Sequence, residues 1–514
     1  MQWLNKVVDE IAAKHPDGEV VIESGVSPSG TYHVGTLREV LTCDAVLLEL
    51  KRRGRQARHV HYVDDLDVFR KVPNNVPPEF DKHLGKPLCD VPAPDGSSQS
   101  YADYFLNDFL TAAKKLHMDM DVIRSHEKYR AGNMTDVVEI ALENVAKIRE
   151  AIEEISGRQL EKDWAPIQVM EGGYLKNRRF VSIDKAAKAV TYLDAEDKEQ
   201  ATSYAKGEVK LNWRVDWPAR WWQLGIQVEP FGRDHATKGG SYDTGAEIVK
   251  EVFGGQAPYP VPYNFINLAG ETKKMSKSTG EIIAISDFTK VMPAEVVRYF
   301  TLRYAPEKLL FFDPEEGVVK LIDDYAALLA RQRSDDDQQT IDICSVGTDT
   351  TVSSVPFSHL VASYQAALKD PAKTLEIISR TEHGGTVGKQ QEIIKKELAF
   401  IGEWLKKWAP EDVKFELAEK VDAGRFTDEQ KTFLARLADT IAGAPADADG
   451  EWFHKAIYEL KEAGNLMPEQ VFAPLYQALI GKNSGPRAGW FLSILPRNWL
   501  IKRSEERRVG KECS

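Results

Sequence analysis

Apolar and polar residues near the start of the chain follow the pattern of two strands separated by a helix. Val20 to Val26 is a short, mostly apolar run, and after a loop rich in Gly, Ser and Pro the apolar positions of Val34 to Arg53 recur with a helical period. Ala57 to Val63 is a second apolar run. A strand, a helix and a strand at this spacing predict a parallel α/β sheet, which binds ligands at the carboxyl ends of its strands.

The same pattern continues up to Ser156 and then changes. Tyr101 to Leu116 predicts a helix, Asp121 to Arg124 a strand and Asn133 to Ser156 a long helix. Lys71 to Ser100 is rich in Pro, Asn, Asp, Gly and Ser, which is typical of a long surface loop. Leu160 to Lys210 alternates short apolar and polar runs and predicts a small inserted antiparallel unit.

The last third of the chain is helical in pattern. Ser334 to Pro356 has no apolar periodicity, whereas nearly every segment from Phe357 onward repeats its apolar positions at helical spacing. Ser504 to Ser514 has no apolar face. We therefore expect an α/β domain over 1–290 with an inserted unit at about 157–210, a connecting helical region over 291–334, a linker over 335–356, an all-α domain over 357–503 and a non-native or disordered tail over 504–514.

The loop from Ser24 to Gly35 has the character of a phosphate-binding loop. Gly25, Gly30 and Gly35 let the backbone turn sharply or let a phosphate approach closely, and the helix that follows favours an anion at its start. His33, at the mouth of this helix, could donate a hydrogen bond to a phosphate. A lone histidine can equally be an ordinary loop or core residue, so the context has to decide.

Other chemically active residues follow later strands. Asp64, Asp65 and Asp67 come directly after the strand that ends at Val63, where carboxylates would attract a cationic substrate, although aspartates are also common in turns and caps. Asp234 follows the apolar run Ile226 to Phe231, a position that suits a ribose hydroxyl.

Lysines far downstream could complete a triphosphate site. Lys273 to Ser278 reads KKMSKS and follows a predicted strand from Tyr263 to Leu268. Such lysines act as point charges on phosphates when negative charge shifts toward pyrophosphate. The alternative is a solvated basic turn, which the position after a strand makes the weaker interpretation.

Composition narrows the class of protein. A chain of 514 residues exceeds a single hydrophobic core. With no apolar run of ~18 residues and no signal sequence, we expect a cytoplasmic enzyme without a membrane partner. The four cysteines are scattered and form no CxxC pair, so no structural zinc is predicted. The net charge of −12 opposes nucleic-acid binding, but basic clusters at Lys51 to His59, Lys176 to Arg179 and Arg497 to Arg503 could still hold RNA locally.

Two motifs together resemble the signatures of class I aminoacyl-tRNA synthetases. They are PSGTYHVG, which ends at Gly35, and KMSKS. Within that class, three further segments are similar to the class I lysyl-tRNA synthetases, namely LNWRVDWPARWW, FGRDHATKGGSYDTG and GPRAGWF. The resemblance runs from about Glu19 to Arg503. Thr36 stands where the second His of the first signature would be, and Lys277 stands where members of this family often carry Ser.

The resemblance implies a fold and an activity. The fold is a Rossmann-type catalytic domain with a parallel sheet and an inserted connective-peptide unit, followed by an all-α anticodon-binding domain. The activity is ATP-dependent attachment of lysine to tRNA(Lys) through a lysyl-adenylate, with Mg²⁺ accompanying ATP. Lysine and tRNA(Lys) are the expected partners, and a monomer is favoured.

The resemblance also assigns residues to roles, and none of them is a metal ligand. Three would be catalytic: His33, Lys274 and Lys277. Seven would bind ATP: His33, Gly35, Thr36, Gly232, Asp234, Lys274 and Lys277. Seven would bind lysine: Gly25, Ser27, Asp65, Phe69, Trp213, His235 and Tyr263. Which of Asp64, Asp65 and Asp67 meets the lysine ammonium stays open.

Three other functions stay open from the sequence. A class I synthetase for another amino acid would share the chemistry. A nucleotidyl ligase that acts without tRNA would not need the helical region after Ser334, and a non-catalytic tRNA-binding relative would not need His33.

Overall fold

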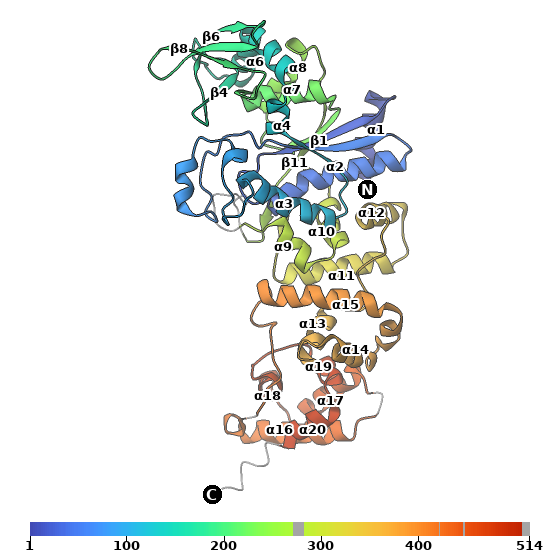
Figure 1. Cartoon of the computed structure of the whole chain (residues 1–514). Helices are drawn as coiled ribbons and strands as arrows, with labels where there is room; N and C mark the ends of the chain where they lie inside the picture. Colours follow the sequence, from blue (N-terminus) through green and yellow to red (C-terminus); the bar gives the residue numbers. More distant parts are fainter. Residues whose placement is uncertain (271–281, 421, 446–447, 506–514) are drawn as a thin grey trace. The chain divides into compact units, whose positions relative to one another are not determined.

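The computed structural model describes residues 1–270, 282–420, 422–445 and 448–505 (Figure 1). The chain divides into two compact units. The first comprises Met1–Thr289, Val297–Phe312 and Ser334–Gly347. The second comprises Lys290–Val296, Asp313–Arg333 and the chain from Thr348 onward.

The first unit is built on a five-stranded parallel sheet with the strand order β11-β10-β1-β2-β3. Val20 pairs with Ala57 and Val26 with Val63, so β1 and β2 are aligned over their whole length. All neighbouring strands are parallel, which brings their carboxyl ends to one edge of the sheet and confirms the predicted α/β class. The strands are β1 (Val20–Val26), β2 (Ala57–Val63), β3 (Asp121–Arg124), β10 (Val228–Gly232) and β11 (Tyr259–Tyr263).

The direction of strand addition reverses between β1 and β10. From β1 the chain adds β2 and then β3 on one side, and only much later adds β10 and β11 on the other side. In open parallel sheets, ligands bind in the crevice outside the strand ends at such a switch point. The topology therefore identifies the carboxyl ends of β1 and β10 as the place to look for a site.

Helix α2 (Val34–Arg52) connects β1 to β2 and packs against both. Its first turn stands at the carboxyl end of β1, and Gly54, with φ of +76°, follows its last turn. The chain begins with the helix α1 (Gln2–Lys14), which buries Leu4, Val8 and Ile11 on one face.

The segment after β2 is more ordered than a plain loop. It contains the short 3₁₀ helices η1 (Pro78–His83) and η2 (Leu88–Asp90), followed by α3 (Tyr101–Lys115) and, after β3, α4 (Ser125–Arg130). The single long helix expected over 133–156 is two helices, α5 (Thr135–Glu143) and α6 (Val145–Ser156). They break at Asn144, whose side chain donates a hydrogen bond to the Ile140 carbonyl and so competes with the helical backbone.

The antiparallel strands expected between residues 160 and 210 form two three-stranded sheets, with the orders β5-β4-β9 and β6-β7-β8. Tyr204 and Val209 are buried in the core that these sheets share with α5 and α6. The strands are β4 (Ile167–Glu171), β5 (Tyr174–Lys176), β6 (Arg179–Asp184), β7 (Ala189–Leu193), β8 (Glu199–Ser203) and β9 (Val209–Leu211).

After the insert, the chain returns to the parallel sheet through α7 (Trp213–Leu224) and β10, and α8 (Ser241–Glu251) joins β10 to β11. The region 291–334, expected to be helical, also contains a strand, because β13 (Leu310–Phe312) pairs in parallel with β12 (Ile266–Leu268). Three residues are too few to show a period in the sequence. The helices of this stretch are α9 (Ile285–Val291), α10 (Ala294–Leu302) and α11 (Glu316–Ala330).

The linker expected over 335–356 is wrong for its first half, because α12 (Asp335–Ser345) is a helix. Ser334 and Asp337 form a reciprocal capping box, and the acidic first turn suits the positive end of the helix dipole. Gln339 is buried and accepts a hydrogen bond from the N-terminal ammonium group at 2.6 Å. The acidic residues that follow Ser334 therefore mark the start of a helix.

The described part of the second unit contains helices and no strand, which confirms the predicted all-α C-terminal region. Phe433, Phe453, Leu475 and Phe491 are buried in its core. α20 includes Ser504 and Glu505, which the sequence assigns to the tail, and the remaining tail residues lie outside the described part. The helices not yet given are α13 (Phe357–Ala366), α14 (Pro371–Ser379), α15 (Gly384–Lys407), η3 (Ala423–Arg425), α16 (Asp428–Ala442), α17 (Gly450–Ala463), α18 (Pro468–Ile480), α19 (Ala488–Ile494) and α20 (Arg497–Glu505).

A search of the described residues for a membrane-crossing helix finds none that has both the length and the apolar character for it.

Candidate active site

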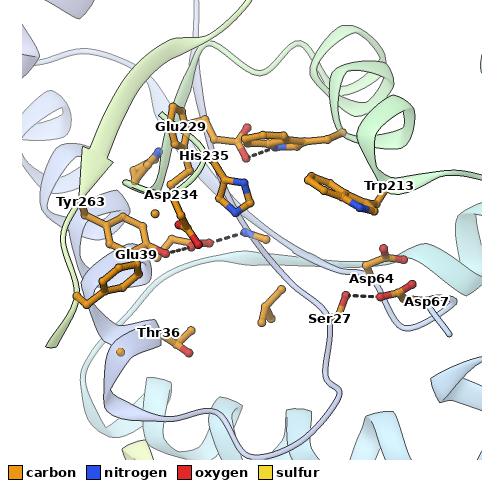
Figure 2. A pocket seen from close by; sticks show the side chains of 18 of the residues that line it. Ser27, Thr36, Glu39, Asp64, Asp67, Trp213, Glu229, Asp234, His235 and Tyr263 are labelled. Atoms are coloured by element: carbon orange, nitrogen blue, oxygen red, sulfur yellow. Dashed lines mark hydrogen bonds between the residues drawn. The ribbon is translucent and has the colours of Figure 1, made fainter. Parts of the chain in front are cut away.

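A cavity of about 480 Å³ opens at the carboxyl ends of β1 and β10 (Figure 2). Ten of the predicted site residues line it, although they come from distant parts of the chain. They are Gly25, Ser27, His33, Gly35, Thr36, Trp213, Gly232, Asp234, His235 and Tyr263. The topological switch point and the sequence motifs therefore identify the same place.

His33 is fixed at the start of α2. It is the N-cap residue, and its Nδ1 accepts a hydrogen bond from the Gly35 N–H at 3.1 Å. Because Nδ1 accepts, the proton of the neutral ring lies on Nε2, which is then the donor. A Cβ at Gly35 would lie 2.8 Å from the His33 ring, so only glycine leaves the ring in this position.

The loop of His33 also pairs with the chain that follows the KMSKS motif. Val34 N–H donates to the Ile283 carbonyl at 3.0 Å, and Ile285 N–H donates to the Tyr32 carbonyl at 3.1 Å. Lys274 and Lys277 themselves lie outside the described residues. The end of their segment is nonetheless held beside the His33 loop.

Glu39 joins three elements at the cavity wall. One of its carboxyl oxygens accepts the Gly25 N–H at 2.8 Å, and the other accepts the Tyr263 hydroxyl at 2.6 Å (Figure 2). Burial raises the pKa of Glu39 to about 7, against the effect of these two hydrogen bonds. A cation in the cavity would stabilise the ionised form of this carboxyl group.

Two of the three aspartates after β2 line the cavity. Asp67 accepts a hydrogen bond from Ser27 Oγ at 3.0 Å and pairs with Arg70 at 2.6 Å. Asp64 pairs with the buried Lys210 at 3.2 Å, and burial raises its pKa to about 6 despite this lysine.

Asp65 and Phe69, which the resemblance assigns to lysine binding, do not line the cavity. Asp65 is fully buried, and its carboxylate accepts hydrogen bonds from Arg124 Nε and His126 Nδ1, both at 2.6 Å. Burial alone would raise the pKa of Asp65, but His126 and Arg124 outweigh it and hold the pKa below its usual range. Phe69 is also fully buried, with its ring 4.9 Å from that of Tyr101.

Aromatic rings from α7 form part of the cavity wall. Trp213 is 39% exposed and its ring centroid lies 5.9 Å from that of His235, while the buried Trp217 lies 5.6 Å from the same ring. Trp217 Nε1 donates to Glu229 at 2.6 Å (Figure 2). Trp217 and Trp221 are buried, whereas Trp213 lines the cavity and is partly exposed.

Gly232 and Asp234 form the end of β10. Asp234 is exposed, and a Cβ at Gly232 would lie 2.5 Å from Asp234 Oδ1, so glycine is needed for the aspartate to fold back in this way. The turn is closed by the His235 N–H, which donates to the Gly232 carbonyl at 2.9 Å. Asp234 is thereby held at the mouth of the cavity.

Sequence reasoning missed five charged residues of the cavity: Glu39, Arg70, Asp216, Arg220 and Glu229. Arg220 pairs with the buried Glu23 at 3.3 Å and with Asp216 at 3.5 Å. The available signal was Glu23 and Glu229, each a charged residue inside an otherwise apolar strand. A buried charge needs a partner, so both positions pointed to a polar network.

The part of the chain that the structure describes holds no group of three or more His, Cys, Asp and Glu side chains arranged for a metal ion. Among the described residues, Cys43, Cys89 and Cys344 are not joined in disulfides.

Comparison with known families gives two matches. A family model described as tRNA synthetases class I (K) matches residues 1–346. A second model, described as an anticodon binding domain, matches residues 395–506.

Curated relatives match over nearly the whole chain. A lysine--tRNA ligase of Methanosarcina barkeri (strain Fusaro) is 36% identical, and the match covers 98% of this chain and 97% of that one. A lysine--tRNA ligase of Archaeoglobus fulgidus is 34% identical, covering 98% and 99%. One from Pyrococcus horikoshii is 32% identical, also covering 98% and 99%.

Proposed function

The chain belongs to the family of class I tRNA synthetases (K), and from that premise we propose that it attaches lysine to tRNA(Lys) with ATP, through a lysyl-adenylate. The observation that carries the choice of lysine is the charge of the cavity. Six acidic side chains line it, against two arginines. The carboxylates are Glu39, Asp64, Asp67, Asp216, Glu229 and Asp234.

The two arginines are already paired. Arg70 pairs with Asp67, and Arg220 pairs with Glu23 and Asp216. A negatively charged side chain such as glutamate would therefore meet repulsion in this cavity, whereas an ammonium group would be stabilised. Glu39, Asp64 and Asp67 are the carboxylates that we assign to the lysine end of the cavity, and Trp213 would cover the aliphatic stem.

The first step forms the adenylate. The lysine carboxylate attacks the α-phosphate of ATP, the bond between the α- and β-phosphates breaks, and pyrophosphate leaves. His33 Nε2–H would donate to the phosphates, with Gly35 and Thr36 at the helix start and Asp234 on the ribose. No protein nucleophile is needed, so position and charge supply the rate.

Lys274 and Lys277 are proposed to act on the departing pyrophosphate. Ile283, six positions after Lys277, is bonded to Val34 beside His33. Six residues span at most ~20 Å, which allows the lysines to share one triphosphate with His33. Mg²⁺ would be held mainly by the phosphates of ATP and would neutralise part of their charge.

The second step transfers lysine to tRNA. A hydroxyl of the terminal tRNA adenosine attacks the acyl carbon, the bond from that carbon to the phosphate oxygen breaks, and AMP leaves. By the class I resemblance, the attacking group is the 2′-hydroxyl. The match of residues 395–506 to an anticodon binding domain supports tRNA as the partner. We place the reaction in the cytoplasm and favour a monomer.

Charging of purified tRNA with labelled lysine tests this function. We expect the full chain to charge lysine tRNA and not glutamate tRNA, with ATP consumed in proportion. Pyrophosphate exchange with each amino acid in turn, tRNA included, checks the choice of substrate. Exchange with another amino acid and none with lysine would contradict the proposal.

A further inference from the structure

A buried carboxyl group in the lining of the cavity is bonded to two tryptophans of α7. Glu229 is only 3% exposed, and each of its two oxygens accepts an indole N–H. Trp217 Nε1 donates to Oε1 at 2.6 Å, and Trp221 Nε1 donates to Oε2. The two tryptophans are four residues apart, so Glu229 ties β10 to two successive turns of α7.

Only one of these two tryptophans reaches the ligand side. The Trp217 ring lies 5.6 Å from that of His235, at an interplanar angle of 64°, and both residues line the cavity. Trp221 is not among the lining residues; its ring contacts Trp217 at 4.9 Å and Tyr242 at 5.7 Å. The two hydrogen bonds are thus alike in chemistry, but only the Trp217 ring lies at the cavity.

A carboxyl group at this place is costly. Burial raises the pKa of Glu229 well above its ordinary value, and the neighbouring carboxyl of Glu23 raises it further. An apolar residue of similar volume would fill the space at lower cost. What an apolar residue could not do is accept two N–H groups and fix the planes of two indole rings.

We propose that Glu229 is a positioning residue for the amino acid. It fixes the ring plane of Trp217, and Trp217 in turn sets the orientation of His235 at the cavity. Glu229 acts through these rings and does not contact the reacting atoms. The identity of the amino acid as lysine rests on the proposed function, whereas the role of Glu229 holds for whichever amino acid the cavity takes.

Steady-state charging of tRNA by Glu229→Leu tests the proposal. Loss of both acceptors should raise the KM for lysine about tenfold, on the scale of two lost hydrogen bonds, while the KM for ATP stays within about twofold. Glu229→Gln, which retains one acceptor oxygen, should restore part of the affinity for lysine. It also keeps the test possible if the leucine variant does not fold.

Two matched variants separate positioning from plain stability. Trp217→Phe and Trp221→Phe each remove one N–H donor and the same amount of ring, but only Trp217 contacts His235. Trp217→Phe should raise the KM for lysine about as much as Glu229→Leu, and Trp221→Phe should leave it within about twofold. In the double variant of Glu229 and Trp217 the effects should not add, because both act on one ring.

An equal rise in lysine KM for the two tryptophan variants would overturn the proposal, as would parallel changes in the KM for lysine, the KM for ATP and kcat. Such results would make Glu229 a structural residue only. A wild-type chain that charges another amino acid would overturn the proposed function instead. The ratios of KM between each variant and the wild type, measured with that amino acid, would still decide the role of Glu229.

Discussion

The ends of β2 and β10 lie on either side of β1 at one edge of the sheet, and one aspartate after each of them, Asp65 and Asp234, shows the contrast between them. Asp65, after β2, is fully buried and bonded to Arg124 and His126. Asp234, after β10, is exposed and lines the cavity. A position after a strand end therefore does not by itself bring an aspartate to the cavity, because Asp65 is held away from it by Arg124 and His126.

The largest expected effect is on stability, at the end of β2. Asp65→Ala removes the acceptor of Arg124 and His126 and should lower the free energy of unfolding by about 3 kcal/mol, because a buried cation loses a partner. Urea denaturation followed by circular dichroism measures it. Asp121→Ala is the control, since Asp121 pairs with Arg58 at 3.7 Å on the surface and should cost less than about 1 kcal/mol. An equal loss of unfolding free energy in Asp65→Ala and Asp121→Ala would contradict the structural role of Asp65.

The next effect is on rate, at the end of β1. His33→Ala should lower adenylate formation ~100-fold, the scale for loss of one transition-state donor. The free energy of unfolding should change by less than about 1 kcal/mol, because His33 is partly exposed. Pyrophosphate exchange and urea denaturation of the same preparation measure both quantities. Full activity of this variant would mean that the cavity performs no adenylation.

A smaller effect is expected at the end of β10. Asp234→Ala should raise the KM for ATP about tenfold through the loss of one charge-assisted hydrogen bond, with the stability unchanged. Asp234→Asn keeps an acceptor oxygen, so its KM for ATP should lie between those of the wild type and of Asp234→Ala. If Asp234→Ala unfolds at a lower urea concentration than Asp65→Ala, then Asp234 is the structural aspartate and the assignment of the two residues is wrong.

The smallest effect is the pH dependence of the β2 network. The folded-state pKa of Asp65 lies below its ordinary value of 3.8, so its stabilisation is present above that pH and is lost as the pH falls through the folded-state value. The difference in unfolding free energy between wild type and Asp65→Ala should thus stay constant between about pH 7 and pH 5 and shrink below about pH 4. A difference that grows on acidification would contradict the assigned pairing.

Much of this fold could be predicted because its signals are local. The apolar runs of β1 and β2 and the periodic positions of α2 lie within single segments, and the glycines before α2 mark the crevice. The cavity lining followed from motifs: His33, Gly35 and Asp234 stand where the two strand ends meet.

What could not be predicted depends on contacts between distant segments. Asp65 and Asp67 look alike in the sequence, and only the arrival of Arg124 and His126 from β3 and α4 separates them. Glu39 and Glu229 belong to no motif, and their partners Tyr263 and Trp217 lie in other elements. The helix α14, by contrast, has a local start signal, because Asp370 is its N-cap residue and Pro371 stands at its first position.

The central claim is that lysine and ATP meet in the crevice between the ends of β1 and β10. A crystal structure with a non-hydrolysable lysyl-adenylate analogue tests it most directly. We predict the adenosine beside Gly35 and Asp234 and the lysine ammonium among Glu39, Asp64 and Asp67, with Asp65 still bonded to Arg124. An analogue bound elsewhere, or an ammonium group on Asp65 with the Arg124 pair broken, would contradict the account.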